Sequence, residues 1–238
     1  MAPVSAASEP IPFAANDLMS AGPFAPTRRP AHLRGMSDFA DRVIGHYERH
    51  AREWDADRRK ASWNDKPWHD RFVAALPPGA TVLDIGCGAG SPVAQHMVER
   101  GLRVTGIDAS PTLVSLCRER LPDQEWIVAD MRALRLGRRF AGVLAWDSFF
   151  HLAPDDQRGM FEVFAAHAAP SAVLMFNGGS AHQEVIGAYR GDPLYHASLS
   201  GDEYQTLLDA IGFDVIAHEV EDWRHGGGRT VWLARSRG

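Results

Sequence analysis

The chain has 238 residues, of which 45% are hydrophobic and 23% charged, and its formal net charge is −5 at pH 7. These values are typical of a globular domain with a sizeable core. No Lys/Arg cluster stands out, which argues against a nucleic-acid partner, because phosphate binding needs concentrated positive charge. No run approaches the roughly 18 apolar residues of a membrane span, so we expect no membrane partner. No signal-peptide pattern opens the chain, so we expect a cytoplasmic protein. The two cysteines have neither a disulfide-framework nor a zinc-ligand spacing, and we expect no metal.

Residues 1–35 are rich in Ala and Pro and have no periodic apolar face, which predicts a disordered tail. Residues 36–79 follow as a helical segment. Its first helix shows apolar residues at helical intervals, at Phe39, Val43, Tyr47, Ala51 and Trp54. A second helix is expected to begin at Pro67, which suits a first helical position. The main domain is then expected over residues 80–238.

The main domain opens with an apolar run, Thr81–Ile85, that predicts a buried strand. Gly86, Gly88 and Gly90 follow at alternate positions, and helical spacing resumes at Val93. A strand, a glycine turn and a helix are typical of a nucleotide-binding unit. The spacing fits neither the dinucleotide pattern G-x-G-x-x-G nor a phosphate-binding P-loop, which disfavours an NAD-dependent oxidoreductase.

The stretch Asp84-Ile85-Gly86-Cys87-Gly88-Ala89-Gly90 resembles the D-x-G-x-G-x-G motif of class I S-adenosylmethionine-dependent methyltransferases. The resemblance covers about residues 40–238. It implies an α/β fold with a doubly wound, mostly parallel seven-stranded sheet, a C-terminal antiparallel hairpin and an N-terminal helical lid over the cofactor. Asp84 and the three glycines are then expected to contact S-adenosylmethionine.

A second acid, Asp108, ends the next predicted strand, residues 102–107. An acid at this place in a doubly wound fold accepts hydrogen bonds from a ribose diol. The alternative is that Asp108 caps the following helix. Ser110, directly before Pro111, can supply that cap instead. Ala109 is assigned to the cofactor together with Asp108.

A third acid, Asp130, follows the predicted strand Glu125–Val128. The resemblance implies that Asp130 accepts from the adenine amino group and that Met131 offers a backbone N–H to the ring. The alternative is a solvated turn acid. Trp146, at the end of the predicted strand 141–146, is also assigned to the cofactor.

Residues 47–58 resemble the aromatic-x-x-x-Ala-x-x-aromatic-Asp-x-x-Arg pattern that opens many small-molecule methyltransferases. The resemblance implies that Tyr47 and Arg58 approach the methionyl end of the cofactor, where a guanidinium suits a carboxylate. Trp54 stands where the family often has Tyr or Phe. Simple packing is the alternative for the aromatic residues.

Ligands of open α/β sheets bind beyond the carboxyl ends of the strands, so the stretches 147–152 and 177–182 are expected to face each other. His151 lies on this rim and is the candidate general base, since an ordinary imidazole pKa lies near 6.5. The alternative is a histidine that only shapes the pocket or caps a helix. The long, aromatic connection 180–200 is expected to be functional. The predicted substrate-pocket residues are Phe150, His182, Tyr195 and His196.

The last elements are a helix that ends at Gly212 and two strands, 213–220 and 230–234, which match the family's closing hairpin. The resemblance implies methyl transfer from S-adenosylmethionine to a small-molecule O, N or C nucleophile, which leaves S-adenosylhomocysteine. The N-methylase tetrapeptide Asn/Asp-Pro-Pro-aromatic is missing at 147–150, which disfavours a nucleic-acid substrate. A non-catalytic nucleotide-binding module is the alternative. We expect a monomer or a homodimer.

Overall fold

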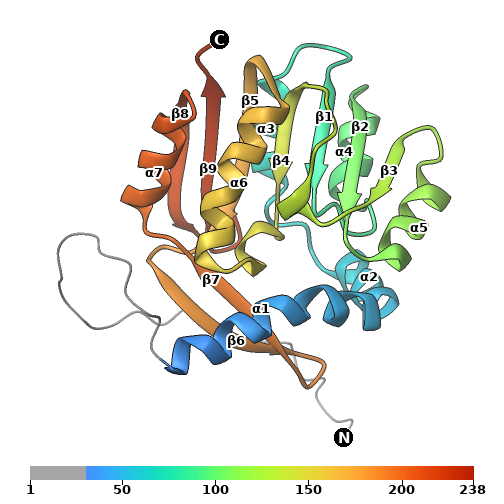
Figure 1. Cartoon of the computed structure of the whole chain (residues 1–238). Coiled ribbons are helices and arrows are strands. Elements are labelled where there is room, and N and C mark those ends of the chain that lie inside the picture. Colours follow the sequence, from blue (N-terminus) through green and yellow to red (C-terminus); the bar gives the residue numbers. More distant parts are fainter. Residues whose placement is uncertain (1–30) are drawn as a thin grey trace, which may run out of the picture.

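Seven strands form one sheet in the order β3-β2-β1-β4-β5-β9-β8 in the computed structural model, which describes residues 31–238 (Figure 1). The strands are β1 Thr81–Ile85, β2 Arg103–Asp108, β3 Glu125–Val128, β4 Phe140–Ala145, β5 Ala168–Gly178, β8 Phe213–Asp222 and β9 Arg229–Ser236. β9 is antiparallel to both of its neighbours, and the other pairings are parallel. The predicted fold class is confirmed. The chain reverses its winding direction between β1 and β4, which is where such sheets bind ligands.

Helices cover both faces of the sheet. α3 Lys66–Ala74, α4 Val93–Glu99 and α5 Pro111–Arg120 pack on one face, and α6 Pro154–His167 and α7 Gly201–Ala210 pack on the other. Short 3-10 turns, η1 Met131–Ala133 and η2 Phe149–His151, follow β3 and β4. Trp68 and Phe72 of α3 are fully buried against the sheet. α3 therefore belongs to the sheet's packing, although it was expected in the lid segment 36–79.

Two helices, α1 Ala31–Arg49 and α2 Ala51–Lys60, lie across the carboxyl ends of the parallel strands (Figure 1). α1 begins at Ala31, so residues 31–35 of the predicted tail are helical, which corrects that boundary. Residues 1–30 of the predicted tail lie outside the described residues.

Both lid helices are fastened to the sheet domain by a carboxylate. Glu48 of α1 accepts from Thr112 N at 3.1 Å and Thr112 Oγ1 at 2.7 Å at the start of α5, and from the hydroxyl of Ser110. Asp55 of α2 accepts two hydrogen bonds of 2.6 Å from the guanidinium of Arg120. Arg120 also donates to the carbonyl of Ala89 at 3.0 Å, so α2 is tied to the glycine turn.

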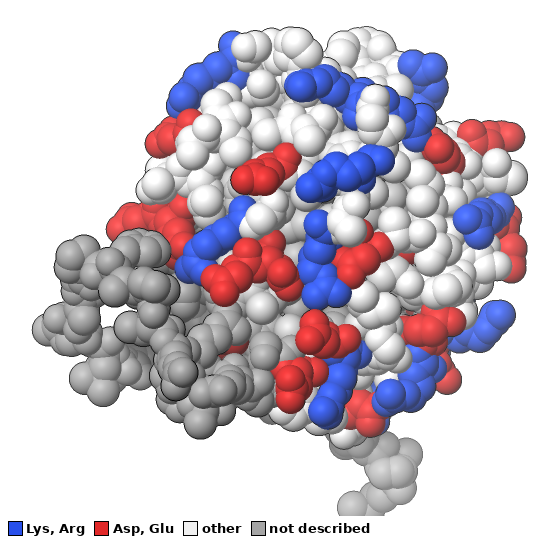
Figure 2. Space-filling model, viewed as in Figure 1, with Lys and Arg blue, Asp and Glu red and all other residues white. Residues whose placement is uncertain are grey.

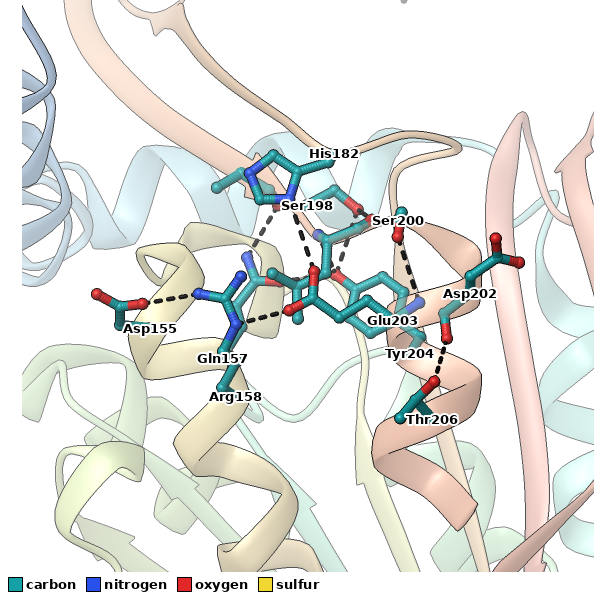
Figure 3. A network of polar contacts seen from close by, with 12 residues as sticks. Asp155, Gln157, Arg158, His182, Ser198, Ser200, Asp202, Glu203, Tyr204 and Thr206 are labelled. Carbon is teal, nitrogen blue, oxygen red and sulfur yellow. Dashed lines mark hydrogen bonds and ion pairs between the residues drawn. The ribbon is translucent and has the colours of Figure 1, made fainter. Parts of the chain in front are cut away.

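The stretch 180–200, expected only as a long connection, contains an antiparallel hairpin of β6 Gln183–Tyr189 and β7 Asp192–Ser198. α1 packs along β7 beneath the main sheet (Figure 1). The end of β7 is anchored by buried polar groups (Figure 3). Gln157 Nε2 donates to Ala197 O at 3.0 Å, Tyr204 Oη donates to Gln157 Oε1 at 2.6 Å, and Gly179 N donates to Ser198 Oγ at 2.9 Å.

Candidate functional site

Two hollows adjoin beyond the carboxyl ends of the strands. The first hollow lies between α1, α2, the glycine turn and the ends of β2, β3 and β4. The second hollow lies between the end of β5, the β6–β7 hairpin and the turn between β8 and β9. The residues that line both hollows are Tyr47, Trp54, Arg58, Asp147 and His151. These five residues, called the junction below, form the boundary between the two spaces.

The glycine turn leaves no room for side chains where it meets its neighbours. Gly86 has φ +76°, and a Cβ there would lie 2.2 Å from Ser148 Cβ. Gly88 has φ +55°, and a Cβ there would lie 2.7 Å from the ring of Trp54. Both conformations are ones that L side chains rarely adopt. Gly86 and Gly88 line the first hollow, whereas Gly90 does not: it faces Cys117 and Trp126.

Asp84, at the end of β1, is 3% exposed and lines the first hollow. Its Oδ2 is buried and has no hydrogen-bond partner among the described residues. Burial and the nearby Asp108 raise the pKa of Asp84 to about 7. An unpaired buried carboxyl group of this kind is suited to accept from a ligand's donor or cation.

Asp108 follows β2 and is held by two backbone groups. Its Oδ2 accepts from Gly88 N at 3.0 Å and its Oδ1 from Ser110 N at 2.9 Å. Ser110 caps α5, because its hydroxyl accepts from Leu113 N at 3.2 Å. Asp108 therefore does not serve as the cap, and each carboxylate oxygen keeps acceptor capacity toward the first hollow. Burial raises the pKa of Asp108 despite these hydrogen bonds.

Asp130 and Met131 both line the first hollow beyond β3, and Ala109 lines it beside Asp108. The carboxylate of Asp130 accepts from Arg132 Nη2 at 2.6 Å and from Arg132 N at 2.9 Å. Asp130 is thus fixed by an ion pair with its neighbour, which neither the ligand role nor the solvated-turn alternative had anticipated.

An ion-pair cluster lies at the junction. Asp147 has φ +48° and exchanges two hydrogen bonds with Asn177, at 2.8 and 2.9 Å. Arg229 donates hydrogen bonds to the Asp147 carboxylate from Nε and Nη2, each at 2.6 Å. Arg58 Nη2 lies 3.4 Å from Asp147 Oδ2. Burial favours the neutral form of Asp147, but the charges of Arg229 and Arg58 outweigh it and lower its pKa.

Asp65 adds a second carboxylate to this cluster and contacts Trp146. Trp146 Nε1 donates to Asp65 Oδ2 at 2.6 Å, and Arg229 Nη1 lies 3.6 Å from the same oxygen. Burial favours the neutral form, but His69 at 3.8 Å and the charges of Arg229 and Arg58 hold the pKa of Asp65 well below its usual value. The indole of Trp146, which lines the first hollow, is thereby fixed in position.

His151 is buried at the junction and both of its ring nitrogens are engaged. Nδ1 lies 2.8 Å from Tyr195 O, and Nε2 lies 2.8 Å from Tyr47 Oη. A carbonyl can only accept, so Nδ1 carries the proton and Nε2 accepts from the Tyr47 hydroxyl. Burial, assisted by His196, lowers the pKa of His151 to about 3. The ordinary pKa that the general-base expectation assumed is therefore corrected.

Two of the four predicted substrate-pocket residues line the second hollow and two do not. Phe150 and His196 line the second hollow and stack with ring centroids 5.5 Å apart. His182 does not line it, because its half-exposed imidazole turns toward Glu203, 3.7 Å away (Figure 3). Tyr195 does not line it either, because its ring is fully buried and its hydroxyl donates to Glu184 at 2.6 Å.

Several lining residues had no assignment from the sequence. Trp54 covers Gly88 and lines both hollows, although its position in the aromatic pattern was noted. The second hollow also contains side chains whose role no local pattern signalled, namely Ser180, Gln183, Glu221, Trp223 and Arg229. Only the expectation that 177–182 faces the site pointed toward part of this set.

The chain is similar in sequence and in fold to known methyltransferases. Residues 82–171 match a family model described as a methyltransferase domain. This match spans less than half of the 238 residues. Over 108 residues the chain is 31% identical to dTDP-3-amino-3,4,6-trideoxy-alpha-D-glucopyranose N,N-dimethyltransferase of Streptomyces venezuelae, covering 44% of this chain and 45% of that protein. Over 60 residues it is 45% identical to trans-aconitate 2-methyltransferase of Azoarcus sp., covering 24% and 23%. The matches thus span less than half of each of these relatives.

Two solved structures share the fold of this chain. A 1,6-didemethyltoxoflavin-N1-methyltransferase of Burkholderia thailandensis has a TM-score of 0.66 at 20% identity, covering 90% of this chain and 93% of that chain. An amino pentose methyltransferase of Micromonospora echinaspora has a TM-score of 0.60 at 23% identity, covering 77% and 95%. None of the helices in the described residues is long and apolar enough to cross a membrane.

Proposed function

We propose that the first hollow binds S-adenosylmethionine and that the second hollow binds a small-molecule acceptor, to which the methyl group is transferred across the junction. One observation carries this proposal: Tyr47, Trp54, Arg58, Asp147 and His151 line both hollows. Molecules in adjoining hollows with a shared wall can bring reacting atoms into contact, and positioning alone can lower a barrier by about 7–11 kcal/mol.

The residues of the first hollow fit this cofactor. Asp108 would accept from the ribose hydroxyls, and Met131 and Asp130 would lie at the adenine end. Asp84 Oδ2, which is buried without a partner among residues 31–238, would accept from the cationic aminoacyl end. When bound, the cofactor supplies a methyl group that its sulfonium already activates.

His151 is poorly suited to take a proton from the acceptor. With a pKa of about 3 the imidazole binds a proton weakly. Its unprotonated nitrogen, Nε2, already accepts a hydrogen bond from Tyr47. We therefore propose that His151 holds Tyr47 in place at the junction, and that the acceptor binds with its nucleophile already deprotonated or releases the proton to solvent. This replaces the general-base role with the pocket-shaping alternative.

The character of the surface supports a small acceptor over a polyanion. On the face in Figure 2, Lys and Arg alternate with Asp and Glu, without a continuous basic area. Binding along a phosphate backbone would need such an area. Whether the protein is cytoplasmic, and whether it is a monomer or a homodimer, stay predictions.

A non-catalytic cofactor-binding module is the second candidate function. The second hollow disfavours it, because a module that only binds the nucleoside would have no use for a lined space beyond the junction. Thermal-shift titrations with S-adenosylmethionine, S-adenosylhomocysteine and NAD test the binding half of the proposal. We expect the first two ligands to raise the Tm in proportion to ln(1 + [L]/Kd) and NAD to leave it unchanged.

Transfer itself is tested by incubating the protein with methyl-labelled S-adenosylmethionine and a panel of acceptors. The panel should contain amino-sugar nucleotides and tricarboxylates, the compounds named in the relatives above, with a Tyr47→Phe, Arg58→Met double variant as the matched control. Label transfer by the wild type but not by the variant would support the proposal. Binding of the cofactor without transfer to any member of a broad panel would favour the non-catalytic module.

A further inference from the structure

A separate cluster of side chains lies where α1 meets the tip of the β6–β7 hairpin. His46 is in the last turn of α1, His50 lies between α1 and α2, and Asp192 is the first residue of β7. One imidazole nitrogen of each histidine and one carboxylate oxygen of Asp192 all lie within 4.8 Å of one another. None of the three residues lines either hollow.

His46 has a buried nitrogen that nothing in the described protein binds. The residue is 4% exposed, and its Nε2 has no hydrogen-bond partner among the described residues. The rings of His50 and Tyr189 pack against it, with centroids 4.9 and 5.9 Å away. Burial, followed by the nearby His50, lowers the pKa of His46. A buried polar atom without a partner among the described residues is suited to bind a ligand.

The other two groups lie close to His46, each with one ligand atom within 4.8 Å of an imidazole nitrogen of His46. His50 Nε2 lies 2.9 Å from Asp192 Oδ2. Arg49 also pairs with Asp192, but the Arg49 side chain is 64% exposed and can turn into solvent when a cation takes its place. The backbone of α1 continues through this point, because His50 N donates to His46 O at 3.1 Å. His50 therefore follows His46 by four residues, directly after the end of α1, and both imidazoles can lie on the same side of the chain.

We propose that His46, His50 and Asp192 form a binding site for a late first-row divalent cation such as Zn²⁺. Two imidazoles and one carboxylate are a donor set that this class of metal favours, whereas Mg²⁺ and Ca²⁺ prefer sites made of oxygen atoms alone. Zinc bonds to nitrogen and oxygen measure about 2.0–2.2 Å, so tetrahedral ligand atoms lie about 3.3–3.6 Å apart. The separations in the cluster reach at most 4.8 Å, so small side-chain movements would bring the ligand atoms to this spacing. A fourth position is left for water.

A cation at this site would link the lid helix α1 to the β6–β7 hairpin. Its ligands come from α1, from His50 directly after α1 and from β7. The adjoining Tyr189 and Arg190 already bind Asp57 of α2, each at 2.8 Å. His46 directly precedes Tyr47 of the junction, so a cation here would fix the helix that carries Tyr47. The expectation of no metal considered cysteine spacing, and Asp192 lies 142 residues from His50, beyond the reach of any local motif.

The test uses the untagged full-length protein, stripped of metal, with no cofactor present, so that its outcome is independent of methyl transfer. Zn²⁺ is titrated calorimetrically into the wild type, Asp192→Asn, His46→Gln and the control His182→Gln, with Mg²⁺ as the contrasting cation. Asp192→Asn is the principal variant, because the Asp192 side chain is 37% exposed and its replacement should not affect folding. His182→Gln removes a half-exposed imidazole outside the site.

We expect one Zn²⁺ per chain in the wild type and in His182→Gln, with affinity at least tenfold lower in Asp192→Asn and His46→Gln. At a Zn²⁺ concentration 100 times the Kd, the Tm of the wild type should rise by about 5–10 °C. Three results would overturn the proposal: no saturable Zn²⁺ binding, unchanged binding by a folded Asp192→Asn, or an equal loss in His182→Gln. Equal affinity for Mg²⁺ would overturn the assigned class of metal.

Discussion

The hydroxyl of Tyr47 donates a hydrogen bond of 2.8 Å to Nε2 of His151, across 104 residues of sequence. Tyr47 belongs to α1 of the lid, and His151 belongs to η2 beyond β4. Their rings also meet edge to face, with centroids 5.2 Å apart. This pair therefore joins the lid to the sheet domain at the junction of the two hollows.

We expect Tyr47→Phe to reduce the free energy of unfolding by about 1–3 kcal/mol, because the change leaves the buried Nε2 of His151 without its donor. Denaturant unfolding followed by circular dichroism measures this. Tyr189→Phe is the matched control: its more exposed hydroxyl donates to Asp57, and we expect a loss below about 1 kcal/mol. Equal losses in the two variants would show that the Tyr47–His151 bond contributes nothing special.

The depressed pKa of His151 predicts a pH dependence of stability. Folded His151 stays neutral down to a pKa of about 3, whereas in the unfolded chain an imidazole takes up a proton near pH 6.5. The unfolded state thus binds more protons between these values, so stability falls as the pH falls through this window. Relative to His151→Asn, the wild type should lose about 1.4 kcal/mol per pH unit between pH 6 and pH 4. Parallel curves for the two proteins would contradict the buried, neutral His151.

The pairing of Arg229 with Asp147 predicts a large effect of Arg229→Met. Removing one partner of a buried ion pair costs about 3–5 kcal/mol, and the two side chains here are 23% and 21% exposed, so we expect a loss of about 2–4 kcal/mol. Arg237→Met breaks an exposed pair with Asp214 and should cost at most about 1 kcal/mol. Urea unfolding of both variants tests this difference, and an Arg229→Met loss as small as the control's would refute the structural role of the cluster.

The raised pKa of Asp84 predicts that cofactor binding is linked to pH. If a ligand's cationic end binds ionised Asp84, the carboxyl with its pKa of about 7 must lose its proton first. The affinity for S-adenosylhomocysteine should then fall about tenfold between pH 8 and pH 6, since one pKa unit corresponds to a factor of ten. Adenosine has no aminoacyl end, so its affinity should change much less. A pH dependence in Asp84→Asn equal to that of the wild type would rule out Asp84 as its source.

Local patterns predicted much of the sheet domain. The glycine turn and the cap at Ser110 were predicted correctly because each depends on residues within a few positions. The strand Glu125–Val128 has the predicted bounds for the same reason. The closing hairpin followed from the resemblance.

The remaining features depend on partners distant in sequence. The β6–β7 hairpin was missed because Gly187 and Pro193 weaken its strand pattern, and its buried side faces α1 rather than the main sheet. The Asp147–Arg229 pair joins residues 82 positions apart. The exclusion of His182 and Tyr195 from the second hollow depends on Glu203 and Glu184 as their partners. No spacing rule predicts such pairs.

We propose that the first hollow binds S-adenosylmethionine with Asp108 at the ribose. Isothermal titration of S-adenosylhomocysteine and of NAD into the wild type and Asp108→Ala tests it most directly. We predict one S-adenosylhomocysteine per chain in the wild type, no NAD binding, and an affinity about tenfold to hundredfold lower in Asp108→Ala, because charge-assisted hydrogen bonds contribute about 1.5–3 kcal/mol. Unchanged affinity in a folded Asp108→Ala, or binding of NAD in place of S-adenosylhomocysteine, would contradict the account.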